Sequence, residues 1–120
     1  MKTRESSSLS ARVVFLDKDK ILPQLFTAAK RLRVDPNVVD VRLFGSLSKG
    51  DFVPGSDADV LIVLKNDARR MIDRIPEYLN YFMNVELPVD VFPYTENEVR
   101  KMRAERNGLI REALENGMEL

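Results

Sequence analysis

The sequence contains neither cysteine nor histidine among its 120 residues. Without cysteine the chain forms no disulfide and no thiolate metal site. Without histidine it lacks the usual general base at neutral pH and the commonest ligand of transition metals. Any catalytic or metal-binding chemistry must therefore rest on carboxylates, which suit hard cations such as Mg²⁺.

The chain also lacks a net charge and a long apolar segment. Nineteen basic residues balance nineteen acidic ones, whereas long contact with a nucleic-acid backbone requires an excess of positive charge. We therefore expect no extended nucleic-acid surface, and a small nucleotide or a protein as partner. The N-terminal MKTRESSSLS is polar, and no apolar run is long enough for secretion or for spanning a membrane. The expected location is the cytoplasm, without membrane contact.

The length and the 44% share of hydrophobic residues predict a single compact domain over residues 1–120. The Ser-rich residues 1–10 are expected to form a mobile tail, and the apolar residues 13–16 an edge strand. Apolar periodicity predicts the elements that follow. These are a helix over 19–33, strands over 39–45 and 60–64, a helix over 67–83, a strand over 87–92, and a helix over 95–107 with further helical turns ended by Gly117.

Three local signals refine this prediction. Pro23 is tolerable only near the first turn of its helix, and Pro76 is expected to kink or split the helix over 67–83. Thr95 followed by Glu98 forms a capping box, which starts the last helix. The order of helices and strands predicts one α/β (α+β) unit whose mixed sheet is packed by helices.

The stretch from Gly45 to Asp59 carries the clearest functional signal. Gly45 closes one predicted strand, and the pair Asp57 and Asp59 opens the next. On an extended strand, residues two apart point to the same face about 7 Å from each other, so these two carboxylates can grip a metal together. Antiparallel pairing of the two strands places the Gly-Ser turn and the carboxylates at one end of the sheet.

A third aspartate, Asp90, lies in the middle of LPVDVF, where an unpaired buried carboxylate is unfavourable. A helix connects its strand to the strand of Asp59, which is typical of parallel neighbours, so both strands start at the same end. Three carboxylates then converge there. Like charges at that distance oppose ionisation unless cations neutralise them, and two Mg²⁺ ions would do so.

The Gly-Ser turn complements these acidic residues. Gly45 permits close approach of the backbone, and Ser46 can hydrogen-bond phosphate oxygens together with the amides of the following helical turn. Lys49 can add a positive charge. We therefore interpret Gly45, Ser46 and Lys49 as a binding site for the triphosphate of a nucleotide.

Taken together, these motifs resemble the DNA polymerase β-like nucleotidyltransferase superfamily, and within it the minimal nucleotidyltransferase family. The resemblance rests on Gly45-Ser46, on Asp57-Ala58-Asp59 after about ten residues, and on the later Asp90. It covers roughly residues 39–92, with the C-terminal helices similar in a looser way. The loop departs from the family pattern, because Leu47, Ser48 and Lys49 stand where relatives often carry arginines.

The resemblance implies the polymerase β-like fold, with a mixed sheet of three to five strands, and transfer of a nucleoside monophosphate to a hydroxyl. The donor it implies is ATP or another nucleoside triphosphate, with AMP as the group transferred. It implies that Asp57 and Asp59 bind metal, that Asp90 completes the site and helps to activate the acceptor, and that Ser46 holds the triphosphate. It also implies an antitoxin role, in which a tyrosine of a helical HEPN toxin is the acceptor.

Simpler interpretations remain open for each motif. A Gly-Ser pair after a strand is most often an ordinary turn, an Asp-x-Asp pair is commonly a solvated strand end, and Asp90 could face water at a sheet edge. The main alternative function is a non-catalytic module that binds a nucleotide or occludes a toxin. A glycosyltransferase would need a much larger domain, and the sequence lacks the glycine patterns of an EF-hand, a P-loop or a dinucleotide fold.

Overall fold

The computed structural model describes residues 18–49 and 57–120. The elements, in chain order, are α2 (Lys18–Leu32), β1 (Val38–Phe44), the 3₁₀ helix η1 (Ser46–Lys49), β2 (Ala58–Leu64), α3 (Met71–Leu79), the 3₁₀ helix η2 (Asn80–Phe82), β3 (Val89–Thr95), α4 (Glu96–Ala104), α5 (Gly108–Asn116) and β4 (Met118–Glu119). The predicted tail and the predicted strand over 13–16 lie outside the described residues. None of the described helices is long and apolar enough to cross a membrane.

The sheet has four strands in the order β3-β2-β1-β4. β1 pairs with β2 and with β4 in antiparallel fashion, whereas β2 and β3 run parallel. The predicted mixed sheet, the antiparallel pairing of the first two strands and the parallel third strand are therefore confirmed. β2 lies inside the sheet, which explains its unbroken apolar sequence VLIVL.

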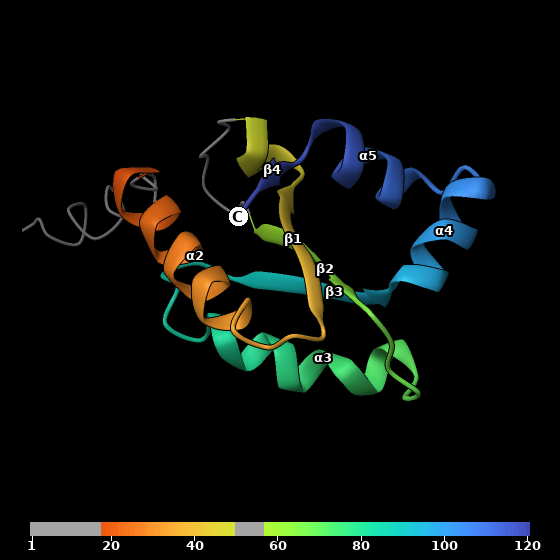
Figure 1. The fold of residues 1–120 in the computed structure, drawn as a ribbon. Helices are drawn as coiled ribbons and strands as arrows, with labels where there is room; N and C mark the ends of the chain where they lie inside the picture. Colours follow the sequence, from red (N-terminus) through yellow and green to blue (C-terminus); the bar gives the residue numbers. More distant parts are fainter. Residues whose placement is uncertain (1–17, 50–56) are drawn as a thin grey trace, which may run out of the picture.

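Helices cover both faces of the sheet, and the alternation of side chains along β2 separates two apolar clusters (Figure 1). On one face, Val60 and Ile62 pack with α2, α3 and η2. On the other face, Leu61 and Val63 pack with α4 and α5. Asp59 is two residues before Leu61 on β2, so both side chains point to the face that carries α4 and α5.

The predicted start of the helix over 67–83 is wrong. Residues 67–70 form a loop, and α3 begins only at Met71. The Asp67 carboxylate accepts a hydrogen bond from the Arg69 amide at 3.0 Å, a local contact that competes with helix formation. Pro76 does not end the helix, which continues to Leu79 before tightening into η2.

Other boundaries also differ from the prediction. Pro23 lies in the second described turn of α2. β3 extends to Thr95, beyond the predicted end at residue 92. The last helical region is divided at residues 105–107, and α5 is followed by β4, a strand that the sequence did not predict. The capping box of Thr95 and Glu98 is confirmed.

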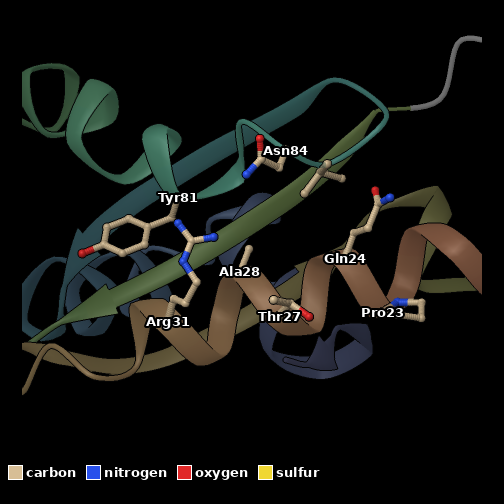
Figure 2. Close-up of a pocket in the computed structure, with 8 residues that line it drawn as sticks. Pro23, Gln24, Thr27, Ala28, Arg31, Tyr81 and Asn84 are labelled. Carbon is tan, nitrogen blue, oxygen red and sulfur yellow. The ribbon is translucent and has the colours of Figure 1, made fainter.

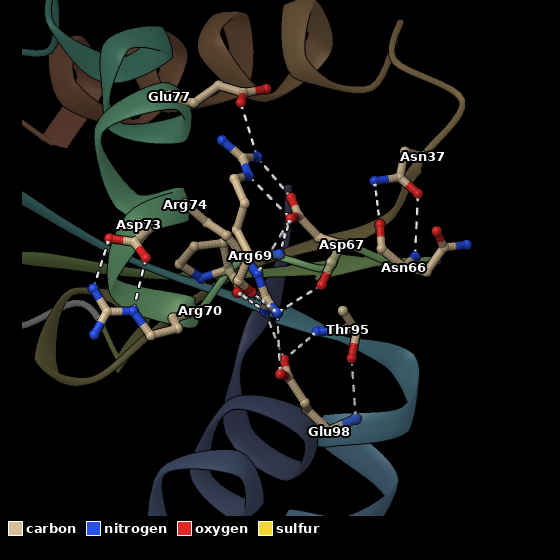
Figure 3. Close-up of polar contacts among 11 residues, drawn as sticks. Asn37, Asn66, Asp67, Arg69, Arg70, Asp73, Arg74, Glu77, Thr95 and Glu98 are labelled. Atoms are coloured by element: carbon tan, nitrogen blue, oxygen red, sulfur yellow. Dashed lines mark hydrogen bonds and ion pairs between the residues drawn. The ribbon is translucent and has the colours of Figure 1, made fainter.

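A buried arginine, Arg74 of α3, fastens the end of the sheet where β2 and β3 finish (Figure 3). Its guanidinium binds both carboxylate oxygens of Glu98, at 2.6 and 3.1 Å. It also donates to the backbone carbonyls of Pro93 (3.0 Å), Asp67 (2.9 Å) and Arg69 (2.6 Å). One side chain therefore holds α3, the loop after β2, the end of β3 and the start of α4 together.

Candidate active site

The predicted acidic residues lie at the opposite end of the sheet from Arg74. Asp59 is the second residue of β2, and its direct partner on the parallel strand β3 is Asp90. Neighbouring strands are about 4.8 Å apart, and both residues have the parity of the α4 and α5 face, so their carboxylates project side by side. Asp57 precedes β2 directly and is exposed. The structure thus brings Asp59 and Asp90 together, with Asp57 next to them.

The electrostatics of Asp59 reflect this crowding. Partial burial raises the pKa of the Asp59 carboxyl above its ordinary value, and the negative charges of Asp90 and Asp57 raise the pKa further. Within the described part of the chain, no cationic side chain forms an ion pair with these three aspartates. Negative charge that the described residues do not neutralise is suited to an incoming cation.

Gly45 places the turn after β1 directly against this cluster. Its φ of +82° is a left-handed conformation, and a Cβ at this position would lie 2.7 Å from the Asp59 Oδ2 atom. Phe44, the residue before it, is the strand partner of Asp59. The turn and the carboxylates therefore lie at one end of the sheet, as the sequence predicted, and their close approach depends on glycine.

The 3₁₀ helix η1 follows the turn and is anchored in two ways. Leu47 is fully buried in the cluster beneath α2, and the Ser48 hydroxyl donates to the Gly45 carbonyl at 2.8 Å. The side chains of Ser46 and Lys49 lie outside what the structure describes. Their contacts with phosphate therefore stay predictions.

The donor set fits Mg²⁺ by its chemistry, because all three candidate ligands are carboxylates. Across residues 18–49 and 57–120, however, no group of three or more acidic side chains is arranged closely enough to hold a metal ion by itself. Magnesium commonly keeps several waters and shares its ligands with substrate phosphates. A site with few protein ligands is therefore compatible with Mg²⁺. Binding of Mg²⁺ at this site stays a prediction.

The loop that leads into β3 is fixed to α2, and this positions Asp90. The Gln24 amide donates to the Glu86 carboxylate and accepts from the Glu86 backbone amide, both at 2.8 Å. A groove of about 250 Å³ lies between α2 and this loop, with the Arg31 guanidinium over the Tyr81 ring at one end (Figure 2). The groove is formed by elements of the other face of the sheet from the aspartates.

Sequence reasoning missed the aromatic residues behind the carboxylates. Phe44 and Phe92 lie on the same face as Asp59 and Asp90, with ring centroids 5.6 Å apart. Phe44 is only 6% exposed, and the pair belongs to the apolar cluster on the same face of the sheet as the two carboxylates. The available signal was the alternation Asp90-Val91-Phe92, which puts an aromatic ring next to the aspartate on one face.

Replacing Gly45 by alanine is expected to destabilise the fold by about 1–3 kcal/mol, because alanine disfavours this φ and its Cβ would clash with Asp59 Oδ2. The matched control is Gly108→Ala, since a Cβ there meets nothing within 4 Å and the position starts a helix. The control is expected to be neutral or slightly stabilising. Urea denaturation of both variants measures the difference, and equal stabilities would contradict the close approach at Gly45.

Two solved structures share this fold. A candidate nucleotidyltransferase from Sulfolobus solfataricus is 21% identical, with a TM-score of 0.59 over 85% of this chain and 80% of that chain. A mutant of the toxin–antitoxin complex MntA–HpeT contains a chain that is 23% identical, with a TM-score of 0.51 over 88% of this chain and 72% of that chain. At these identities the likeness concerns the fold.

The family follows from the sequence match. A family model described as a nucleotidyltransferase domain matches residues 22–117, which include the Gly-Ser turn and all three aspartates. The chain belongs to this nucleotidyltransferase domain family. No curated protein shows significant similarity to the chain. The resemblance drawn from Gly45, Asp57, Asp59 and Asp90 is confirmed.

Proposed function

We propose that the protein transfers a nucleoside monophosphate, with AMP from ATP as the first candidate, to a hydroxyl group, and that the reaction depends on Mg²⁺. The observation that carries this proposal is the pairing of Asp59 with Asp90 across β2 and β3, with the Gly45 turn against Asp59. A triphosphate held at this turn would lie beside the carboxylates.

The reaction forms a bond between the acceptor oxygen and the α-phosphorus of the nucleotide, and breaks the bond from that phosphorus to pyrophosphate. A divalent cation held by Asp57, Asp59 and Asp90 would neutralise the phosphates and lower the pKa of the attacking hydroxyl. Asp90 is exposed at the edge strand β3, where an acceptor can reach it, and it is suited to accept the hydroxyl proton.

We also propose a protein as acceptor, and a tyrosine of a HEPN-type toxin as the particular group modified, in the cytoplasm. One of the structures that share the fold comes from a toxin–antitoxin complex, which supports this proposal.

Two measurements test the function. Calorimetric titration of the purified protein is expected to show binding of ATP in the presence of Mg²⁺ and much weaker binding in EDTA. Incubation with the purified protein of the adjacent reading frame, followed by intact mass measurement, is expected to show a mass increase of whole AMP units only when ATP and Mg²⁺ are supplied.

Asp73→Asn provides the matched control for Asp90→Asn in both measurements, because Asp73 is an exposed carboxylate of α3 paired with Arg70. The control is expected to keep the mass increase and Asp90→Asn to lose it. A partner that binds tightly but gains no mass at any Mg²⁺ concentration would contradict catalysis. That result would instead support the non-catalytic module, which neutralises a toxin by occlusion.

A further inference from the structure

Three arginines surround a hollow at the joint between α4 and α5. The hollow has a volume of about 340 Å³ and is lined by Arg103, Arg106, Arg111, Leu114 and Glu115. It lies beyond the end of β3 from which α4 starts, whereas Asp90 is near the opposite end of that strand. In Figure 1 the joint is at one end of the molecule, away from η1. This arginine hollow is therefore separate from the candidate active site.

The charge of the chain is unevenly distributed around this hollow. Residues 100–111 contain five basic residues and one acidic residue, although the whole chain is neutral. Among the described residues, no acidic side chain pairs with Arg103 or Arg106. Arg111 pairs with Glu115 at 3.7 Å, and both side chains are about 60% exposed, so this pair is weak. The hollow thus has a local positive charge that the fold leaves largely uncompensated.

Backbone hydrogen bonds at the joint fix the positions of the main-chain atoms of the three arginines. The Arg106 amide donates to the Arg103 carbonyl at 3.0 Å, and the Asn107 amide donates to the Met102 carbonyl at 2.9 Å. These two bonds end α4 in a Schellman motif. The Arg111 amide donates to the Asn107 carbonyl at 3.0 Å. A hydrogen-bonded scaffold reduces the entropy that the arginines lose when they bind a common ligand.

Arg106 occupies the one position of this motif where glycine is strongly preferred. Its φ is +60°, and it is the only non-glycine residue with a positive φ in the described part of the chain. An arginine in this conformation is less stable than a glycine. The conformational cost of this arginine draws attention to its side chain, which lines the hollow.

We propose that the arginine hollow is a second anion-binding site, which takes a phosphate group. Guanidinium groups bind phosphate oxygens through paired, charge-assisted hydrogen bonds, and three of them can surround one group. The phosphate would come either from a free phosphorylated ligand or from the terminal phosphate of an oligonucleotide. This inference is independent of catalysis, because it involves none of the proposed metal ligands.

The test measures binding of pyrophosphate to the full chain by calorimetry in EDTA. Without divalent cations, the carboxylates of the candidate active site repel anions, which weakens binding at the Gly45 turn. The Arg106→Gly variant then shows how much of the measured binding belongs to the hollow. Arg106→Gly is expected to weaken pyrophosphate binding about tenfold or more. The same substitution is expected to leave the thermal midpoint unchanged or raise it, because glycine suits the left-handed position. Weaker binding by Arg106→Gly can therefore not be attributed to loss of the fold.

Arg100→Gln is the matched control, since it removes the same charge from α4 at a position outside the lining of the hollow. Its affinity for pyrophosphate is expected to stay within about twofold of wild type, because exposed charges are screened by salt. A 5′-phosphorylated RNA hexanucleotide and its unphosphorylated form are then tested in the same way, to identify the source of the phosphate. If the phosphorylated RNA binds more tightly than pyrophosphate, the site is assigned to nucleic acid. If pyrophosphate binds more tightly, the site is assigned to a free ligand.

Three outcomes would overturn the proposal. The first is that the wild-type protein does not bind pyrophosphate. The second is that Arg100→Gln weakens binding as much as Arg106→Gly, which would show that binding depends on the net charge of the protein and not on the hollow. The third is that a glutamate-rich peptide binds as tightly as pyrophosphate, which would make the hollow a surface for acidic proteins.

Discussion

The Asp59→Asn variant is expected to lose nucleotidyl transfer by a factor of about 100 or more while its fold remains intact. Asparagine has nearly the same shape as aspartate but lacks the negative charge that binds and positions a divalent cation. Loss of a metal ligand acts on the reacting phosphate directly. Mutation of a residue that only supports a ligand typically lowers activity or metal affinity about 10–100-fold. Initial rates of AMP transfer at saturating Mg²⁺ measure the effect.

The stability of this variant separates a functional site from a structural one. Burial and the charges of Asp90 and Asp57 raise the pKa of Asp59, which means that its ionised form is unfavourable in the folded protein. A neutral asparagine removes that penalty, so the thermal midpoint is expected to be retained or raised. A residue that reduces stability in its native form but is needed for activity is typical of a functional site.

Magnesium provides a readout that does not depend on an acceptor. A ligand that binds only the folded state adds about 2.7 kcal/mol of stability at 100 times its dissociation constant. Mg²⁺ added together with ATP is therefore expected to raise the melting temperature of the wild-type protein and of the Asp73→Asn control, but not that of Asp59→Asn. Full transfer activity in Asp59→Asn, or an equal response of all three proteins to Mg²⁺, would exclude the proposed role of Asp59.

The sequence predicted the arrangement of β1, β2 and β3 well because it depends on apolar periodicity and on short connections. The alternation around Val41 and Leu43 and the unbroken run VLIVL identify a strand with one buried face and a strand buried on both. A helix between β2 and β3 then implies parallel pairing. The pairing of Asp59 with Asp90 follows from this topology, which is why the core of the site could be predicted.

The remaining differences arise from specific polar and close-packing contacts that apolar periodicity does not encode. Local pattern predicted a helix from Asp67, but the carbonyls of Asp67 and Arg69 bind Arg74 and stay in a loop. The strand β4 has two residues and follows Gly117, where a Cβ would collide with the Ala113 carbonyl oxygen. A Cβ on Gly117 would lie 3.0 Å from the Leu43 carbonyl oxygen. Neither contact has a periodic signal in the sequence.

The Arg74→Met variant is expected to be about 3 kcal/mol less stable than wild type. Arg74 is 2% exposed and donates to the carbonyls of Asp67, Arg69 and Pro93. Methionine fills a similar volume but leaves these three acceptors without their donor, at a cost of about 1–3 kcal/mol for each one that stays buried. Against a total stability of 5–15 kcal/mol, typical of such domains, this loss is large. Urea denaturation at 25 °C measures it.

The dependence of stability on pH provides a second measurement. The hydrogen bond from Arg74 lowers the pKa of Glu98, and the hydrogen bond from Arg69 lowers the pKa of Asp67 to about 2. A carboxylate with a lowered pKa stabilises the fold above its unfolded pKa and loses that contribution as the pH falls through its folded pKa. Wild-type stability is therefore expected to fall below about pH 4.5. In Arg74→Met, the part of this decrease that belongs to Glu98 is expected to become smaller, because only the contacts with Thr95 still lower the pKa of Glu98.

Two further variants decide which contacts of Arg74 matter. Arg70→Met, four positions earlier, removes an arginine whose side chain is 80% exposed, and it is expected to cost no more than about 1 kcal/mol. Adding Glu98→Gln to Arg74→Met removes the carboxylate that lost its partner and preserves the capping box. Since Glu98 is 40% exposed, its charge is already solvated, and the double variant is expected to regain little. Full recovery would show that the ion pair, rather than the three carbonyls, stabilises this end of the sheet.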